Sequence, residues 1–277
     1  MRLAVAAVAA LLFAQPPAIH IATHSRAIRP GELVMLSIAV ASPDDVPHVR
    51  AFGQDIGAYR VADREWEALV GIDLDVKPGA YTVTVQAGSE SASHALDVSP
   101  RAFRTRTLTV DPAFVTPPES ERERIEREAR LLDDTWKSSA PERLWTVPFV
   151  RPVPQDANSA FGTRSVFNGK PRNAHGGADF LSPAGTPIRA PNAGTVVIAR
   201  GLFFSGNTVV IDHGLGMFSM LAHLSAFAVH EGDRVSAGQR VGLVGATGRV
   251  TGPHLHWAVR ASGARVDPLS VLAVLGK

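Results

Sequence analysis

The sequence predicts an all-β protein with two domains joined by a short helical linker. Two kinds of evidence support this prediction. Short runs that alternate apolar and polar residues, separated by Gly and Pro turns, fill both halves of the chain, whereas helical periodicity is scarce. The 277 residues also exceed the common domain size of about 100 to 150 residues. We expect a β-sandwich at residues 19–110, a helical and proline-rich linker at 111–150, and an antiparallel sheet domain at 151–277.

The first 18 residues read as a signal peptide. Met1 and Arg2 give a positive start, an apolar run covers residues 3–13, and Ala14 offers a small residue for cleavage. The run is shorter than the roughly 20 residues of a transmembrane helix. We therefore expect export to the periplasm or cell envelope without stable membrane insertion after cleavage; a buried N-terminal helix is the alternative. The chain has no cysteine, which excludes disulfides and a lipid-modified cysteine.

Residues 19–110 contain several short strand candidates separated by turn residues such as Pro30-Gly31 and Pro78-Gly79. The candidates are residues 32–40, 48–52, 66–70 and 80–85. Short strands at this spacing are typical of an immunoglobulin-like sandwich. No cluster of potentially catalytic residues is visible here, so two roles stay open, docking and a simple spacer.

The linker contains one charged helix. Residues 119–132 pair Glu with Arg at i, i+3 and i, i+4, and Ile125, Ala129 and Leu132 fall on one side. Prolines from Pro141 onward then break regular structure. Such a helix is most often solvated; as an alternative, the segment lies across a cleft and makes the protein latent.

The C-terminal half alternates strand candidates with glycine-rich turns. The candidates are residues 195–199, 208–212, 218–223, 240–244 and 255–260. This pattern favours antiparallel sheets that form a groove, and we expect the loops at 164–172 and 201–206 to wall it. Phe203, Phe204 and Trp257 are candidates for substrate contact or for packing.

Four residues carry most of the chemical information. His175 and Asp179 lie in AHGGADF, and His254 and His256 lie in TGPHLHW. A catalytic zinc site usually has three protein ligands and one open position, which a His, Asp, His set fits, with one histidine left for proton transfer. If the His-Leu-His segment is a strand, both imidazoles share one face. The residues alone leave open which of the two binds metal.

Other features narrow the interpretation of this cluster. Gly176, Gly177 and Gly252 allow close backbone approach around it. The HExxH pattern is absent, because His230-Glu231 is followed by Arg234 at the position of the second histidine, so imidazoles have to move the protons. The isolated histidines are interpreted as solvated or hydrogen-bonded; they are His20, His24, His48, His94, His213 and His230.

At this point the chain resembles the lysostaphin-like (LytM-type) zinc metallopeptidases, over roughly residues 155–270. The matching segments, in the order the family has them, are Ser159 to Arg164, His175 to Asp179, Ser182 to Pro187, Ala193 to Val196, Gly206 to Gly214, Ala222 to Ser225, Gly232 to Val235 and Gly252 to His256. The resemblance implies one Zn²⁺ ion held by His175, Asp179 and His256.

The resemblance also implies that His223 and His254 are the catalytic histidines of an endopeptidase that cuts peptide bonds in bacterial peptidoglycan. One position departs from the family, which commonly has a tyrosine where this chain has Leu221. The alternative is a non-catalytic envelope protein that activates another wall hydrolase. Lost ligands would indicate that alternative, and His175, Asp179 and His256 are all present.

The two halves of the chain differ in charge. Residues 151–277 carry twelve Lys and Arg against six Asp and Glu, net +6, and residues 1–150 carry sixteen against twenty, net −4, which together give the overall +2. A basic C-terminal half suits a substrate with free carboxylates, such as peptidoglycan stem peptides. Nucleic acid is not expected as a partner, because no basic and aromatic cluster or known binding motif occurs.

Overall fold

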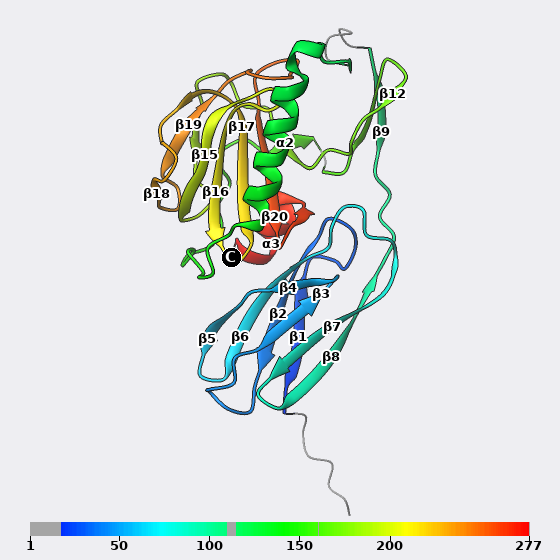
Figure 1. Cartoon of the computed structure of the whole chain (residues 1–277), viewed down its shortest axis with the longest axis vertical. Helices are drawn as coiled ribbons and strands as arrows, with labels where there is room; N and C mark the ends of the chain where they lie inside the picture. The colour runs from blue at the N-terminus through cyan, green and yellow to red at the C-terminus, as the bar shows by residue number, and fades with distance from the viewer. Residues whose placement is uncertain (1–17, 110–114, 160, 277) are drawn as a thin grey trace, which may run out of the picture.

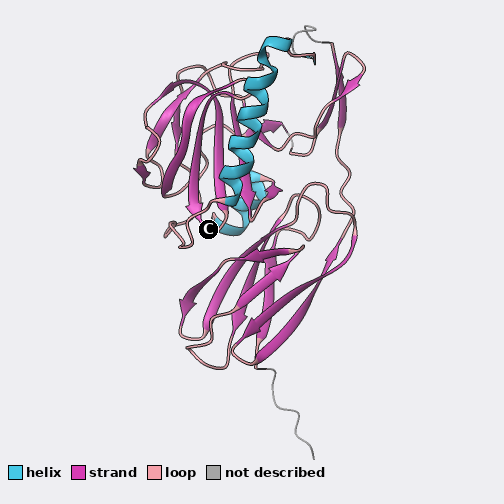
Figure 2. Cartoon of the chain, in the orientation of Figure 1, coloured by secondary structure: helices cyan, strands magenta, loops and turns pink. Residues whose placement is uncertain are grey.

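The structure, a computed structural model, describes residues 18–109, 115–159 and 161–276, and they are mostly β (Figures 1 and 2). The expected all-β class is confirmed, with sheets of antiparallel strands in both halves. The predicted signal peptide lies almost wholly outside the described residues. Within the described part of the chain, no helix has the length and apolar character needed to cross a membrane.

Two four-stranded sheets form the N-terminal half. Their strands are, in sheet order, β1 (His20–Ser25), β2 (Leu33–Ala39), β6 (Glu65–Gly71) and β5 (Ala58–Ala62), then β4 (Gln54–Ile56), β3 (His48–Ala51), β7 (Gly79–Ala87) and β8 (Glu90–Val98). Both sheets bury apolar side chains in one shared core, for example Leu36 from β2 and Val85 from β7. The four predicted strands are present, and β1, β4, β5 and β8 were missed. The immunoglobulin-like assignment stays a prediction.

A ten-stranded sheet dominates the C-terminal half. Its main path is β10 (Ala157–Ser159), β13 (Gly177–Phe180), β20 (Leu255–Ala261), β17 (Met217–Phe227), β16 (Gly206–Gly214), β15 (Gly194–Leu202) and β18 (Arg234–Val235). β14 (Pro187–Arg189) and β19 (Arg240–Val244) branch from β17, and β21 (Ala264–Val266) pairs with β20. All five predicted strands occur in it, each with similar bounds.

The two faces of this sheet have different neighbours. One face carries Val209, Leu221 and Trp257 into the main core, which α3 (Pro268–Leu275) also joins. The other face carries Val210 and Phe218, and the helix α2 packs over it, as Figure 1 shows.

Helix α2 (Arg122–Lys137) follows a short 3-10 turn, η1 (Glu119–Glu121). The predicted helix therefore exists, but its contact side was partly wrong, because Ala129 is exposed whereas Leu131, Leu132 and Trp136 pack on the sheet. The ring of Trp136 meets that of Phe218 edge-on, with centroids 5.3 Å apart.

A third, small sheet connects the two halves. β9 (Thr105–Leu108) pairs in parallel with β11 (Arg164–Phe167), and β11 pairs with β12 (Lys170–Pro171). A strand that precedes the linker thus lies against the C-terminal half. The domain limits at residues 110 and 150 stay a prediction.

The interface between the halves combines apolar and charged contacts. Leu33, Tyr59 and Leu69 belong to the same core cluster as Trp145 and Phe149. Beside them lies a group that we name the Glu32 cluster: Glu32, Arg26, Arg29, Arg101 and Asp267. Asp267 also caps the N-terminus of α3 by accepting from the Leu269 amide at 3.0 Å.

Candidate metal centre

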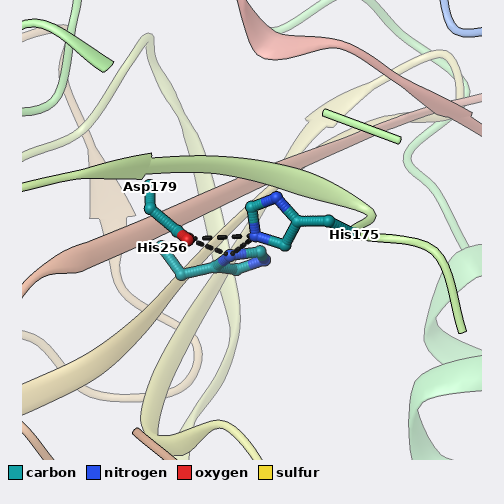
Figure 3. Close-up of side chains that lie close together, drawn as sticks. All are labelled: His175, Asp179 and His256. Atoms are coloured by element: carbon teal, nitrogen blue, oxygen red, sulfur yellow. Dashed lines mark hydrogen bonds and ion pairs between the residues drawn. The ribbon is translucent and has the colours of Figure 1, made fainter. Parts of the chain in front are cut away.

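Three of the predicted residues converge at the junction of β13 and β20. Asp179 and His256 are direct cross-strand partners on these antiparallel strands, and His175 lies two residues before β13. Cross-strand partners on one face have neighbouring side chains. Figure 3 shows the carboxylate of Asp179 and the rings of His175 and His256 pointing toward one another.

The three donor atoms form a small triangle. Asp179 Oδ1 lies 3.0 Å from His175 Nε2 and 2.9 Å from His256 Nδ1, and the two nitrogens are 3.1 Å apart. If both nitrogens donated an N–H to the Asp179 oxygen, no hydrogen bond would join the two nitrogens to each other. A single cation can bind all three atoms at once. Zinc bonds of about 2.0 to 2.1 Å place tetrahedral donors about 3.3 Å apart, so the residues fit a zinc ion.

Gly177 makes room for this arrangement. A β-carbon at Gly177 would lie 2.8 Å from two atoms of the His256 ring and would also overlap the Trp257 carbonyl oxygen. The expectation of close approach is therefore confirmed at Gly177. It is wrong at Gly176 and Gly252, where a β-carbon would meet no atom within 4 Å.

The electrostatics of the triangle favour an ionised Asp179 and a neutral His256. Burial alone would raise the pKa of Asp179, but the contacts from His175 and His256 outweigh burial and hold that pKa well below its usual range. Burial lowers the pKa of His256. A carboxylate and neutral imidazoles are the protonation states that bind a metal.

His223 reaches the site through a backbone irregularity. Between Leu221 and Leu224, β17 holds one residue more than the opposing segment of β16, which is a β-bulge, and His223 has φ of 68°. Regular alternation would place His223 on the same face as Leu221, in the core. The bulge instead turns its ring toward His254 and His256, with centroids 4.8 and 6.0 Å away.

Leu221 is the position at which this chain has leucine where the family commonly has tyrosine. Its side chain is fully buried in the main core and is not part of the groove lining. A change of side chain at this position therefore alters the core rather than the metal site.

Both remaining histidines present Nε2 to the site. The Nδ1–H of His223 donates to the Thr247 carbonyl at 2.9 Å, and that of His254 donates to the Gly252 carbonyl at 2.9 Å. These bonds select the tautomer whose Nε2 carries a lone pair. Burial lowers the pKa of His223 to about 4, so this ring is neutral at pH 7.

A cavity of about 470 Å³ opens over these residues. Its walls include Ser165 and Arg172 from residues 164–172, where the predicted loop is instead the pair of strands β11 and β12, and Phe204 and Ser205 from the predicted loop 201–206. The proposed substrate contact at Trp257 is wrong, because its ring is fully buried and its Nε1 donates to Ser219 Oγ at 3.2 Å.

Arg106, which β9 brings into this cavity, was not predicted as a site residue from the sequence. No local pattern connects Arg106 with a histidine cluster more than 60 residues away, so only the pairing of β9 with β11 reveals it.

A second cavity of about 190 Å³ adjoins the first at His256 and Met220. Helix α2 lines it with Leu132 and Trp136 but contributes no residue to the larger cavity. The alternative that the linker makes the protein latent stays a prediction.

The isolated histidines lie away from the site. His20, His24, His48 and His230 are exposed and His94 is half-buried. His213 is fully buried, and its nitrogens contact the Ala193 carbonyl at 2.7 Å and Ser219 Oγ at 2.9 Å. The interpretation of these residues as solvated or hydrogen-bonded agrees with their positions.

Sequence comparison places the site in a known group. The pattern of Peptidase family M23 matches residues 173–268. The peptidoglycan DD-endopeptidase ShyA of Vibrio cholerae is 46% identical over 95 residues, 34% of this chain. The DD-carboxypeptidase/endopeptidase Mpg of Neisseria meningitidis is 45% identical over 97 residues, 35% of this chain. The matched segment spans 22% of the length of each relative.

A solved structure extends the similarity to both halves of the molecule. A Pseudomonas aeruginosa protein assigned to peptidase M23 is 32% identical, with a TM-score of 0.72. The alignment covers 90% of this chain and 96% of that protein. Since the likeness includes the residues before the metal centre as well as those around it, the chain belongs to peptidase family M23.

Proposed function

We propose that this protein is an exported zinc endopeptidase that hydrolyses peptide bonds in bacterial peptidoglycan. The observation that carries the proposal is the triangle of His175, Asp179 and His256 with His223 and His254 beside it. Two relatives whose names state peptidoglycan DD-endopeptidase or DD-carboxypeptidase/endopeptidase activity support the substrate class.

His175, Asp179 and His256 would hold one zinc ion. When bound, zinc polarises the scissile carbonyl and lowers the pKa of a water molecule from about 15.7 toward about 7. The three side chains contribute one negative charge and two neutral nitrogens, so the loaded site keeps a net positive charge that attracts an oxyanion.

His223 and His254 move the protons in this proposal. Each ring is held by Nδ1–H, so Nε2 accepts the proton of the attacking water. A ring that has taken this proton becomes a donor, and it can stabilise the tetrahedral intermediate or return the proton to the leaving amine. The fixed Nδ1 contacts keep both rings oriented without further reorganisation.

The alternative function is activation of another wall hydrolase without catalysis. Convergence of all three ligand side chains favours the enzyme, because a non-catalytic protein has no need to keep the triangle intact.

Digestion of purified sacculi tests the proposal. We expect the full chain to release soluble fragments, whose mass spectra identify the bond that is cut, and His256→Ala to release none. His230→Ala, at an exposed histidine, is the matched control and should behave like the parent. Equal release by the parent and His256→Ala would exclude the proposed metal chemistry.

A further inference from the structure

Three arginines gather on the walls of the larger cavity. Arg106 comes from β9, Arg172 follows β12, and Arg249 lies in the segment between β19 and β20. Asp179 is the single acidic side chain among the described lining residues, and it belongs to the metal triangle. The cavity therefore has a strong excess of positive charge.

Within the described residues, the contacts of these arginines leave their charge uncompensated. Arg106 Nε donates to Ser165 Oγ at 3.0 Å, and Arg172 donates to the Val115 carbonyl. The Arg249 guanidinium stacks on the Phe204 ring, 4.5 Å from its centroid. All these partners are neutral, and the described residues provide no ion pair for any of the three guanidinium groups.

One atom in this group has no partner in the part of the chain that the structure describes. Arg172 Nε is buried and has no hydrogen-bond partner among the described residues. A buried N–H without an acceptor costs stability unless a ligand provides one. Burial and the neighbouring charge of Arg172 also lower the pKa of Arg249, which indicates that the two guanidinium groups repel each other.

We propose that Arg106, Arg172 and Arg249 form a subsite that binds a free carboxylate of the peptide substrate beside the scissile bond. Guanidinium groups present paired N–H donors that match the two oxygens of a carboxylate. The position in the same cavity as His223 and His254 places the carboxylate on the substrate itself.

This subsite makes the small sheet part of substrate recognition. β9 reaches β11 from the N-terminal side of the linker and delivers Arg106, which together with Arg172 precedes the segment matched by the family pattern. Selection between peptides with free and amidated carboxylates thus depends in part on residues outside that segment, while Arg249 lies inside it. The inference rests on the proposed function only for the identity of the substrate.

Paired substrates provide the test. Two cross-linked stem-peptide dimers are prepared that differ only in whether the carboxylate next to the scissile bond is free or amidated. We expect the full, zinc-loaded chain to prefer the free acid by about tenfold to a hundredfold in kcat/KM, the range of a charge-assisted hydrogen bond. Arg172→Met and Arg249→Met should reduce this ratio severalfold or more, and Arg106→Met, at an exposed residue, should reduce it less.

Arg164→Met is the matched control. Arg164 is exposed on β11 and is absent from the cavity lining, so its variant should keep the parental ratio. A parental ratio near one, or a high ratio that survives Arg172→Met and Arg249→Met, would overturn the inference.

Binding to the metal-depleted full chain separates this inference from the proposed function. Calorimetry then measures binding of the acid and amide peptides. Without zinc, neither peptide is cleaved and the carboxylate cannot bind to the metal directly. Preferential binding of the acid that Arg249→Met abolishes would uphold the subsite even if neither peptide were cleaved. Equal binding of the two peptides, with displacement of both by millimolar inorganic phosphate, would make the cavity a phosphate site instead and refute the carboxylate assignment.

Discussion

The Glu32 cluster and the metal triangle each surround a carboxylate with nitrogen groups, fully buried in Glu32 and half-buried in Asp179. The two groups differ in what those nitrogens can do. Arg26 Nη2 donates to Glu32 Oε1 at 2.9 Å and to Asp267 Oδ2 at 2.8 Å. A guanidinium is always protonated and has no lone pair to offer. Around Asp179 the partners are imidazoles, which can lose a proton and bind a cation.

This difference assigns separate roles to the two groups. In the Glu32 cluster every contact joins a permanent donor to an acceptor, so the group ties the N-terminal sheets to α3 and needs nothing else. In the triangle the nitrogens face each other at 3.1 Å, so the group is complete only with an ion. Substitutions should therefore separate stability from chemistry.

The largest effect is expected at Asp179. Asp179→Asn removes the one anionic ligand, so we expect loss of bound zinc. Loss of a residue that only hydrogen-bonds to a ligand typically lowers activity by about tenfold to a hundredfold, so loss of the ligand itself should lower sacculus hydrolysis by more than about a hundredfold. The amide fills the same space but loses the charge that the two histidines stabilise, so the midpoint of urea unfolding of the metal-depleted protein should fall only modestly. Elemental mass spectrometry and urea titration measure the two quantities. Full zinc content in this variant would contradict the assignment of the ligands.

A loss of turnover without loss of metal is expected at the proton-transfer histidines. His223→Ala and His254→Ala should each lower kcat by about a hundredfold to ten-thousandfold while zinc content stays near one ion per chain. Turnover of soluble wall fragments, measured alongside metal content, checks this. If either variant kept near-normal kcat, that histidine would have no role in proton transfer.

The Glu32 cluster should show the opposite behaviour. Glu32 is fully buried, so Glu32→Gln leaves three guanidinium groups with one carboxylate fewer and should lower the free energy of unfolding by about 3 kcal/mol. Zinc content should not change. Asp55→Asn is the control, because its ion pair with Arg50 is exposed and is worth less than about 1 kcal/mol. Equal unfolding midpoints for the two variants would show that burial of Glu32 carries no special weight.

His213 extends the comparison to an imidazole whose nitrogens are both occupied by protein groups. Burial lowers its pKa from 6.5 to about 4, so the unfolded chain binds more protons than the folded protein between these values. Its contribution to stability is therefore complete above pH 6.5 and is lost as the pH falls toward 4, by roughly 2 to 3 kcal/mol.

Urea titrations of the parent and His213→Gln across pH 4 to 7.5 measure this contribution. The variant cannot titrate at this position, so the stability difference between the two proteins should narrow as the pH falls. A difference that stays constant over the whole range would show that His213 is not the titrating group.

Alternation predicted the strands with one buried face, such as β2 and β7. β1 and β8 were missed because HIATHS and ESASHALDV contain few strongly apolar residues, and β1 in particular buries no side chain fully. Helix α3 escaped notice because its eight residues are almost uniformly apolar and show no helical periodicity. Periodicity in a sequence reflects burial of one face of an element. Elements that are buried on all sides, or on none, therefore cannot be predicted from it.

The sequence by itself identified His175, Asp179 and the His254/His256 pair as the side chains with the chemistry, and the resemblance to the metallopeptidases assigned His256 to the metal and added His223. Donor type and strand parity are local properties, and they carry over into any fold that keeps the strands. Only the tertiary structure decided that a bulge turns His223 out of the core, that β9 brings Arg106 to the cavity, and that the Glu32 cluster joins the two halves. These depend on pairing between segments far apart in the chain, where no local pattern specifies which backbone or charge will meet which.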